Sequence, residues 1–320
     1  MRAFEVRRPG ILTTIQDLGR PGFMKYGIPV SGAADRFSCQ VANWLLGNET
    51  KAAVLEVTLG GLEMVACNAL WITVTGGDLS PLVNGEELPM WRAVLLRKGD
   101  RFSFGRRRKG FRSYVAIRGG FSAPIFLGSR SVFVRGLMGE KISSGKVLET
   151  ENAVISDPCK DPLPPEMIPR LGEDPSFRIV LGPQEDRFTP EGIETFLASE
   201  YKIHFQSDRM GYRLEGPRVE HRKGADILSE PIARGAIQIP GDGLPILILW
   251  DGQVSGGYTK IGHVISADMD RLAQRMPGEK IRFTAIPVEG AHQAYREARD
   301  FHEQVRKFIQ ENLLIRKGKE

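Results

Sequence analysis

Residues 10–35 contain the side chains of this chain that are best suited to binding chemistry. Five glycines punctuate this segment, and the polar residues that we single out among them are Asp17, Arg20, Ser31 and Asp35. The glycines are Gly10, Gly19, Gly22, Gly27 and Gly32. Glycines at this density let the backbone pass close to another backbone or to a ligand, where a side chain would clash. Because the segment has little apolar periodicity, we expect loops here rather than a buried helix or strand. Polar groups on such loops form binding sites when a rigid scaffold positions them, and a glycine-rich surface loop without a ligand is the alternative.

The second half of the chain carries polar residues of the same kinds, again near glycines. They are Arg209, Tyr212, Asp242, Asp251, Gln253, Tyr258 and Lys260, and the first half adds the carboxylate of Glu56. Arginine offers a planar fork for a carboxylate or phosphate, lysine offers a point charge, and carboxylates orient an amide nitrogen, hold Mg²⁺ or act as a base. Structural roles compete for three carboxylates: Asp35 as a helix N-cap, Glu56 as an outward-facing strand residue and Asp242 as a turn residue. The stretch from Gln253 to Lys260, which we expect to be a glycine-rich loop, has the weakest structural explanation.

The elements that must position these groups are mostly short strands. Residues 55–59 and 70–75 alternate with period two, and Asn84-Gly85 is a hairpin signal. Short strands separated by glycine turns indicate a barrel or a sandwich. Three helices are expected from apolar periodicity behind an N-cap residue, at Asp35, Thr189 and Asp268. A fourth helix near the C-terminus carries an apolar stripe of Ala294, Ala298, Phe301, Val305 and Phe308.

Proline density divides the chain of 320 residues. We place a linker at residues 156–176, because no regular element tolerates so many prolines. An N-terminal subdomain then occupies residues 1–155, a C-terminal subdomain residues 177–290, and a C-terminal helix residues 291–320. This length is typical of two domains of ordinary size.

Composition excludes several classes of protein. The net charge of +5, from 44 basic and 39 acidic residues, is too small for a nucleic-acid-binding signal, and the basic run at residues 106–109 is typical of an exposed hairpin tip. Three unpaired cysteines and five scattered histidines predict neither a disulfide framework nor a metal site. The N-terminus lacks the apolar core of a signal peptide, and the longest apolar run, residues 244–250, is too short to span a membrane. We therefore expect a cytoplasmic protein.

Seven segments follow one another in an order that identifies a family. They are residues 13–20, 27–35, 53–58, 119–131, 207–214, 236–243 and 253–261. In this order they resemble the allophanate-hydrolase-subunit-2 family, also called the biotin-dependent carboxyltransferase family, which includes the C component of the prokaryotic 5-oxoprolinase. The resemblance implies a mainly β fold of two tandem cyclophilin-like β-barrel subdomains, with a few short helices. The chain departs from the family pattern at Val254, where a hydroxyl is usual, and at Thr259, where a proline is usual.

The resemblance implies three alternative functions. The first, which we favour, is a subunit of an ATP-dependent 5-oxoprolinase that opens 5-oxoproline to L-glutamate, using ATP with Mg²⁺ in the complex. The second is a carboxyltransferase that moves carboxylate from carboxybiotin to a urea-like amide. The third is a non-catalytic regulator that binds a kinase-inhibitor-like partner. The expected partners are a subunit-1-like, kinase-inhibitor-like protein and a lactam-utilisation protein, and the expected substrate is a small amide or lactam.

No self-contained catalytic motif accompanies this resemblance, so no catalytic residue is assigned. The segment from Gly139 to Lys146 comes nearest to a P-loop, but its glycines are one residue too far apart and Val147 stands where Ser or Thr must bind Mg²⁺. Met24-Lys25-Tyr26 lies in the wrong context for biotin attachment, so we expect no covalent biotin on this chain.

Overall fold

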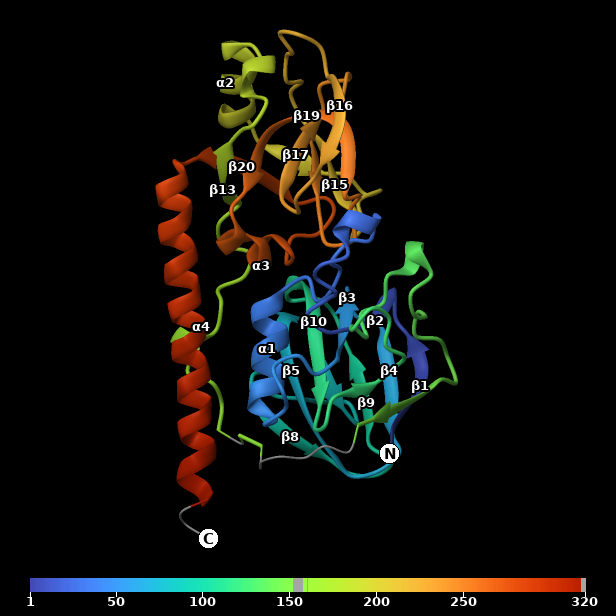
Figure 1. Cartoon of the computed structure of the whole chain (residues 1–320). Helices are drawn as coiled ribbons and strands as arrows, with labels where there is room; N and C mark the ends of the chain where they lie inside the picture. Colours follow the sequence, from blue (N-terminus) through green and yellow to red (C-terminus); the bar gives the residue numbers. More distant parts are fainter. Residues whose placement is uncertain (152–157, 160, 318–320) are drawn as a thin grey trace. The chain divides into compact units, whose positions relative to one another are not determined.

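The computed structural model describes residues 1–151, 158–159 and 161–317, and their packing forms two compact units. The first unit comprises residues 1–20, 31–172 and 300–320, and the second comprises residues 21–30 and 173–299. Each unit is built mainly from strands (Figure 1). The expected fold class, mainly β with two tandem barrel subdomains, short helices and a C-terminal helix, is confirmed.

The first unit packs two antiparallel sheets against each other. Its strands are β1 Arg2–Pro9, β2 Leu12–Gln16, β3 Val54–Thr58, β4 Leu62–Ala66, β5 Leu70–Asp78, β6 Pro81–Val83, β7 Glu86–Glu87, β8 Ala93–Leu96, β9 Arg101–Phe104, β10 Lys109–Ile117, β11 Phe121–Ser122 and β12 Val147–Thr150. One sheet has the order β11-β12-β1-β4-β9-β6-β7, and the other β2-β3-β10-β5-β8. Phe4 and Phe102 of the first sheet share one buried core with Leu55 and Ile72 of the second, because alternate side chains of each strand face inward.

Helix α1, Arg36–Leu45, packs on the side of the five-stranded sheet that faces away from this core. Its N-cap is Asp35, as expected, since the Asp35 carboxylate accepts a hydrogen bond of 2.9 Å from the backbone N–H of Ser38. Ala42 of α1 is buried in one cluster with Tyr114 and Ala116 of β10. The helix therefore holds the Asp35 end of the glycine-rich segment against the sheet.

The glycine-rich segment is not entirely loop, contrary to the sequence expectation. Strand β2 lies within it and is almost wholly buried, because it pairs with β3 and its threonines face the protein interior. The glycines serve close backbone contact at two positions. A Cβ on Gly32 would lie 2.8 Å from the amide nitrogen of Gly19, and one on Gly10 would lie 2.6 Å from the carbonyl oxygen of Gly60.

The second unit is a closed barrel. Its strands are β13 Ser176–Leu181, β14 Tyr201–Ile203, β15 Gly211–Glu215, β16 Asp226–Pro231, β17 Ala236–Ile239, β18 Ile246–Ile248, β19 Ser255–Val264 and β20 Lys280–Ala285. The order β13-β20-β14-β15-β18-β17-β19 closes on itself through the pairing of β13 with β19, and β16 extends β19 outside the ring. Phe177, Leu247 and Phe283 of these strands are buried. Closure removes the exposed strand edges that an open sheet would present.

Residues 255–260 belong to strand β19, so the expectation of a loop from Gln253 to Lys260 is wrong over most of that stretch. Two consecutive glycines suggested a turn, but here they allow neighbouring segments to approach the strand. A Cβ on Gly256 would lie 2.6 Å from Ile232 Cδ1, and one on Gly257 would lie 2.9 Å from the carbonyl oxygen of Ile227.

Two short helices of the second unit were expected behind the N-caps Thr189 and Asp268, and the cap at Asp268 is wrong. Helix α2, Pro190–Ala198, begins after Thr189, whose hydroxyl accepts a hydrogen bond from the Gly192 N–H at 2.9 Å. Helix α3 is a single turn, Met269–Leu272, and Asp268 makes no side-chain cap. The Asp268 carboxylate instead accepts hydrogen bonds from the side chain and backbone of Arg178. The remaining turns are 3-10 helices: η1 Met24–Tyr26, η2 Val134–Gly136, η3 Pro165–Met167, η4 Glu185–Arg187 and η5 Ser266–Asp268.

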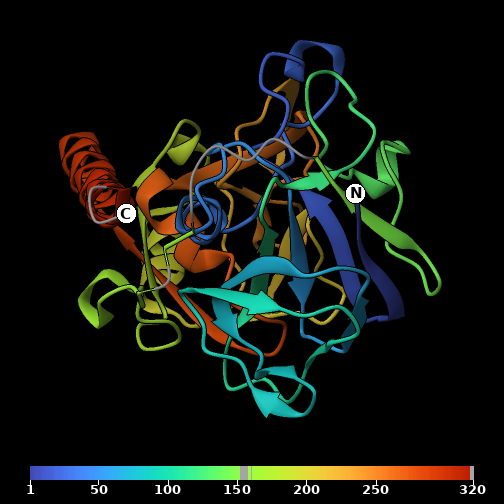
Figure 2. The ribbon, with the colours of Figure 1, turned by 90° about the horizontal axis from the view of Figure 1, so that it is seen from below.

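The C-terminal helix α4, Val288–Lys317, is drawn in red and is seen nearly along its axis in Figure 2. It begins three residues before the expected start at residue 291. Its apolar stripe is confirmed, because Val305 is fully buried and Phe301 stacks on Phe37 of α1 at 5.6 Å between ring centroids. Residues 156, 157 and 160 of the expected linker lie outside the described residues, as do residues 152–155 before it. In its described part, Cys159 and Leu163 are buried beside α1 and η3 forms, so this stretch contains a regular turn that the sequence did not predict.

Candidate functional site

Asp17 and Arg20 fix the loop at residues 126–131 in the first unit. One Asp17 carboxylate oxygen accepts hydrogen bonds from the hydroxyls of Ser129 and Ser131, at 2.6 and 2.5 Å, and the other accepts the Arg130 N–H at 2.6 Å. The buried Arg20 guanidinium donates to the carbonyl oxygens of Phe126 and Ser131. These contacts give both predicted site residues a positioning role.

Glu56 is buried in the first unit and does not face outward as a strand residue, which corrects one expectation. Its carboxylate accepts hydrogen bonds of 2.8 Å from the Ala34 N–H and from the Tyr114 hydroxyl, and it lies 3.7 Å from the guanidinium of buried Arg112. Burial, followed by the charge of Glu56, raises the pKa of Tyr114, so its hydroxyl remains a donor. The network joins β3 and β10 to the chain just before α1.

Ser31 differs from its neighbours because its hydroxyl is buried without a hydrogen-bond partner among the described residues. Its backbone has φ 55°, the left-handed region that non-glycine residues seldom adopt. A buried hydroxyl without a partner is costly, so such a group commonly marks a place where a ligand or water binds.

Two of the predicted residues in the second unit form a buried ion pair. Arg209 Nε lies 2.8 Å from one carboxylate oxygen of Asp251 and Arg209 Nη2 lies 3.3 Å from the other, with both side chains almost wholly buried.

Tyr212 is also buried, and its hydroxyl donates to the carbonyl oxygen of Arg275 at 2.8 Å. Asp242 is a turn residue, as its structural interpretation predicted, because its carboxylate accepts the Leu244 N–H at 3.0 Å.

A polar cluster lies where β17 and β19 pair, and we call Gln238, Gln253 and Lys260 the amide cluster. Lys260 is 2% exposed, and its ammonium forms an ion pair with Glu230. Gln253 Nε2 donates to Gln238 Oε1 at 3.3 Å, while buried Gln238 Nε2 has no hydrogen-bond partner among the described residues. Glycine at position 256 allows this close packing, because a Cβ there would lie 3.1 Å from both amide nitrogens and 2.6 Å from Ile232 Cδ1. Tyr258, at 40% exposure, is the most accessible of the predicted residues on β19.

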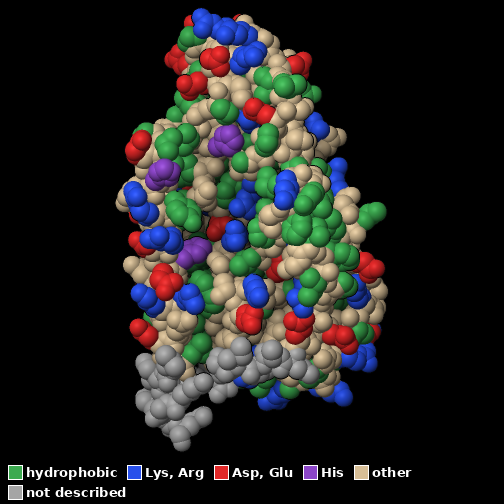
Figure 3. Space-filling view, viewed as in Figure 1, with side chains coloured by type: hydrophobic (Ala, Val, Ile, Leu, Met, Phe, Trp, Pro, Cys, Tyr) green, Lys and Arg blue, Asp and Glu red, His purple; other side chains and the backbone are tan. Residues whose placement is uncertain are grey.

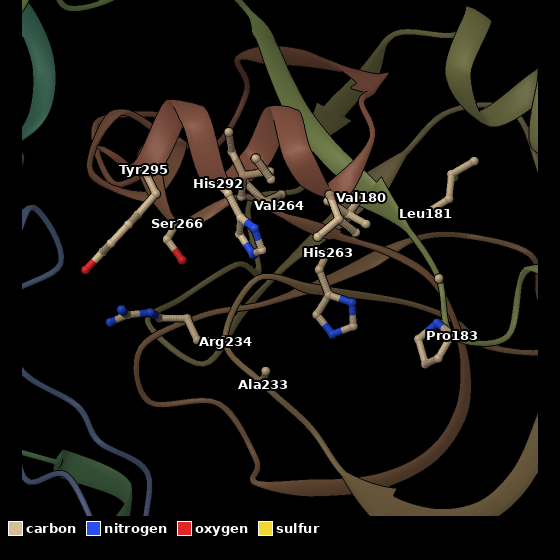
Figure 4. Close-up of a pocket in the computed structure, with 14 residues that line it drawn as sticks. Val180, Leu181, Pro183, Ala233, Arg234, His263, Val264, Ser266, His292 and Tyr295 are labelled. Atoms are coloured by element: carbon tan, nitrogen blue, oxygen red, sulfur yellow. The ribbon is translucent and has the colours of Figure 1, made fainter. Parts of the chain in front are cut away.

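The sequence analysis missed a pocket of about 540 Å³ in the second unit, shown in Figure 4. Its polar lining residues are Arg234, His263, Ser266, His292 and Tyr295. They come from the loop before β17, from β19 and the turn after it, and from the first turns of α4. No local motif relates them, so only barrel closure and the docking of α4 bring them together. Figure 3 shows that histidine side chains reach the surface on the face viewed in Figure 1.

The structure also bears on nucleotide and metal binding. Strand β12 follows the segment from Gly139 to Lys146, whereas a P-loop requires a helix whose N-terminus faces the phosphates, so this segment does not fit ATP. Lys25 lies in η1 and not at a hairpin tip. Within the described part of the chain, no group of three or more His, Cys, Asp or Glu side chains is arranged to hold a metal ion, and no helix is both long enough and apolar enough to cross a membrane.

Comparison with known proteins gives a consistent result. The family described as "Carboxyltransferase domain, subdomain A and B" matches residues 26–285. The chain is 33% identical to the C component of 5-oxoprolinase from Escherichia coli over 305 residues, which cover 94% of this chain and 97% of that protein. It is also 33% identical to urea amidolyase of Lachancea kluyveri over 316 residues, which cover 91% of this chain.

The chain spans only 17% of the length of that urea amidolyase. Among solved structures, urea amidolyase of K. lactis superimposes with a TM-score of 0.88 at 30% identity, covering 95% of this chain and 20% of that one. These relatives are named as enzymes or as subunits of enzymes.

Proposed function

Because the chain belongs to the carboxyltransferase family with subdomains A and B, we propose that it is a subunit of an ATP-dependent 5-oxoprolinase complex that opens 5-oxoproline to L-glutamate. The observation that carries this proposal is similarity to the C component of 5-oxoprolinase over almost the whole of the given sequence. The proteins of that name from E. coli and Haemophilus influenzae are 33% and 31% identical to it, over 94% and 93% of this chain. The proposed partners are a subunit-1-like, kinase-inhibitor-like protein and a lactam-utilisation protein.

The chemistry requires a division of labour between subunits. A lactam is a resonance-stabilised amide, so its carbonyl must be activated before water attacks. ATP with Mg²⁺, when bound in the complex, supplies the phosphoryl group that activates the amide oxygen. Since the segment from Gly139 to Lys146 does not fit ATP, we assign nucleotide binding to the partner subunits.

In this proposal the amide cluster recognises the lactam. Gln238 Nε2 is a buried donor that lacks a partner among the described residues, and a carbonyl oxygen is its natural acceptor. Gln253 supplies a second amide from a more exposed position. Lys260, whose ammonium forms an ion pair with Glu230, lies opposite Gln238 on the paired strand. Gly256 lets the backbone of β19 pass close to both amides, because a Cβ there would lie 3.1 Å from each amide nitrogen.

The test measures glutamate released from 5-oxoproline and MgATP. The purified chain alone should be inactive, and the chain with both partners should turn over. Release by the chain alone, or none by the full set, would refute the proposal. Gln253→Ala should lower kcat/KM of the complex about two- to tenfold, the value of one neutral hydrogen bond, while Gln206→Ala, an exposed glutamine elsewhere in the second unit, should not change it.

A carboxyltransferase acting on a urea-like amide is the second candidate, favoured by the family description and by the TM-score of 0.88 to a urea amidolyase. Here too the amide cluster would bind the acceptor amide. Allophanate formed from urea and carboxybiotin, with no glutamate released from 5-oxoproline in the full complex, would select this function over the first.

A further inference from the structure

The pocket in the second unit is large enough for a small molecule, and no residue predicted from the sequence lines it. Its volume of about 540 Å³ falls within the range of roughly 300–1,000 Å³ that is typical of small-molecule sites. The three residues of the amide cluster do not line it either. A ligand of this pocket is therefore distinct from the amide that the proposed function places beside Gln238.

Most of the pocket wall is apolar. Strands β13 and β19 and helix α4 supply this surface through Val180, Leu181, Val264 and Val288. An apolar ligand body that covers these side chains removes hydrocarbon surface from water on both partners, which is the main favourable contribution to binding at such sites. The ligand should therefore have an aromatic or aliphatic portion.

The pocket does not select a charged ligand. None of the fourteen described residues that line it is acidic, so the lining offers a cation no carboxylate. Arg234 already has a partner within the protein, and Lys260, which lies on the same strand as His263, is paired with Glu230. Burial, and after it the charge of Lys260, lowers the pKa of His263, so its imidazole is neutral at pH 7. Because a charge that leaves water without a partner is costly, these surroundings favour a neutral ligand.

Four polar side chains around the pocket are available for hydrogen bonds to such a ligand. Among the described residues they have no hydrogen-bond partner, and they are His263, Ser266, His292 and Tyr295. Figure 4 shows the imidazoles of His263 and His292 directed into the space. The neutral imidazole of His263 donates through one nitrogen and accepts through the other, and a hydroxyl also does both. The complementary head group is one that both donates and accepts, which a carboxamide or an alcohol does.

We propose that this pocket binds a small neutral organic molecule, with its apolar body against β13, β19 and α4 and a carboxamide or hydroxyl head at His263. The site is separate from the amide cluster, and its existence does not depend on which reaction the complex performs. The apolar wall provides most of the affinity, and His263 orients the head.

The test uses benzamide as the probe, with benzoate and benzylamine as anionic and cationic matches of nearly the same shape. Binding to the full chain is followed by calorimetry and by the histidine Cε1–H proton resonances, which five histidines keep resolvable and which His263→Phe and His292→Gln assign. Saturable binding of benzamide should shift the resonances of His263 and His292. Benzoate and benzylamine should bind at least about tenfold more weakly, because each must bury a charge.

Variants locate the site. Ala291→Phe fills the pocket from α4 and should abolish binding, whereas Gln293→Phe, at an exposed position of the same helix outside the lining, is the matched control and should bind normally. His263→Phe adds no new side-chain branch and keeps a ring, but it loses the hydrogen bond and should weaken binding about two- to tenfold. Thermal melts of each variant separate loss of binding from loss of folding.

Four results would overturn the proposal. They are no saturable binding of benzamide up to about 10 mM, binding of benzoate or benzylamine as tight as that of benzamide, full binding by folded Ala291→Phe or His263→Phe, and shifts confined to other histidines.

Discussion

Glu56→Gln should destabilise the first unit strongly, because it removes the charge that compensates buried Arg112. Glu56 is 1% exposed and Arg112 2%, so water cannot replace the lost carboxylate charge. Leaving one member of a buried ion pair uncompensated costs about 3–5 kcal/mol. At roughly 2–4 °C per kcal/mol for a unit of this size, the melting temperature of the first unit should fall by about 6–20 °C.

The measurement is thermal and urea unfolding of the full chain, in which the first unit's transition is followed. Glu149→Gln, an exposed glutamate on β12, is the matched control and should shift stability by no more than about 0.5 kcal/mol. Adding Arg112→Met to Glu56→Gln removes the uncompensated charge and should restore part of the loss, giving a coupling energy of at least about 1.5 kcal/mol. If Glu56→Gln costs less than about 1 kcal/mol, or if Arg112→Met restores nothing, the buried pair does not hold this unit together and our reasoning is wrong.

Three further predictions follow from named contacts. A hydrogen bond from Arg8, reinforced by Arg101, lowers the pKa of the Glu63 carboxyl in the folded protein. The stabilisation from ionised Glu63 is therefore present above its unfolded pKa and is lost as pH falls through its folded pKa, so the stability difference between the protein and Glu63→Gln in urea melts should shrink below about pH 4.5. A difference that stays constant with pH would contradict this. Lys260→Ala should lower stability by about 1–3 kcal/mol through lost packing of its buried stem, whereas Lys260→Met should retain most of it; equal melting temperatures for the two variants would count against burial of the stem. Gly32→Ala should lower the melting temperature more than Gly27→Ala does. Both glycines have positive φ, but only at Gly32 would the added Cβ meet neighbouring backbone. Equal losses would show that φ alone determines the cost.

The sequence predicts elements whose signals are local. Asp35 caps α1 and Thr189 caps α2 through hydrogen bonds to residues only three positions away, so both appear as short patterns. Asn84-Gly85 marks the β6–β7 turn for the same reason, since both residues adopt positive φ. The family resemblance covered most of the chain and gave the fold class, which local patterns alone left as barrel or sandwich.

The tertiary structure decided what the polar residues do. The contacts between Glu56 and Tyr114, Arg209 and Asp251, and Lys260 and Glu230 join residues 58, 42 and 30 positions apart, so no spacing in the sequence announces them. The consecutive glycines in β19 predicted a loop from the sequence. Their role is to let a neighbouring segment approach the strand closely, and that role is visible only in the folded barrel. The pocket arises in the same way. Strand pairing and helix docking bring His263, His292 and Arg234 into the lining of one pocket, and contacts between distant segments leave no periodic pattern in the sequence.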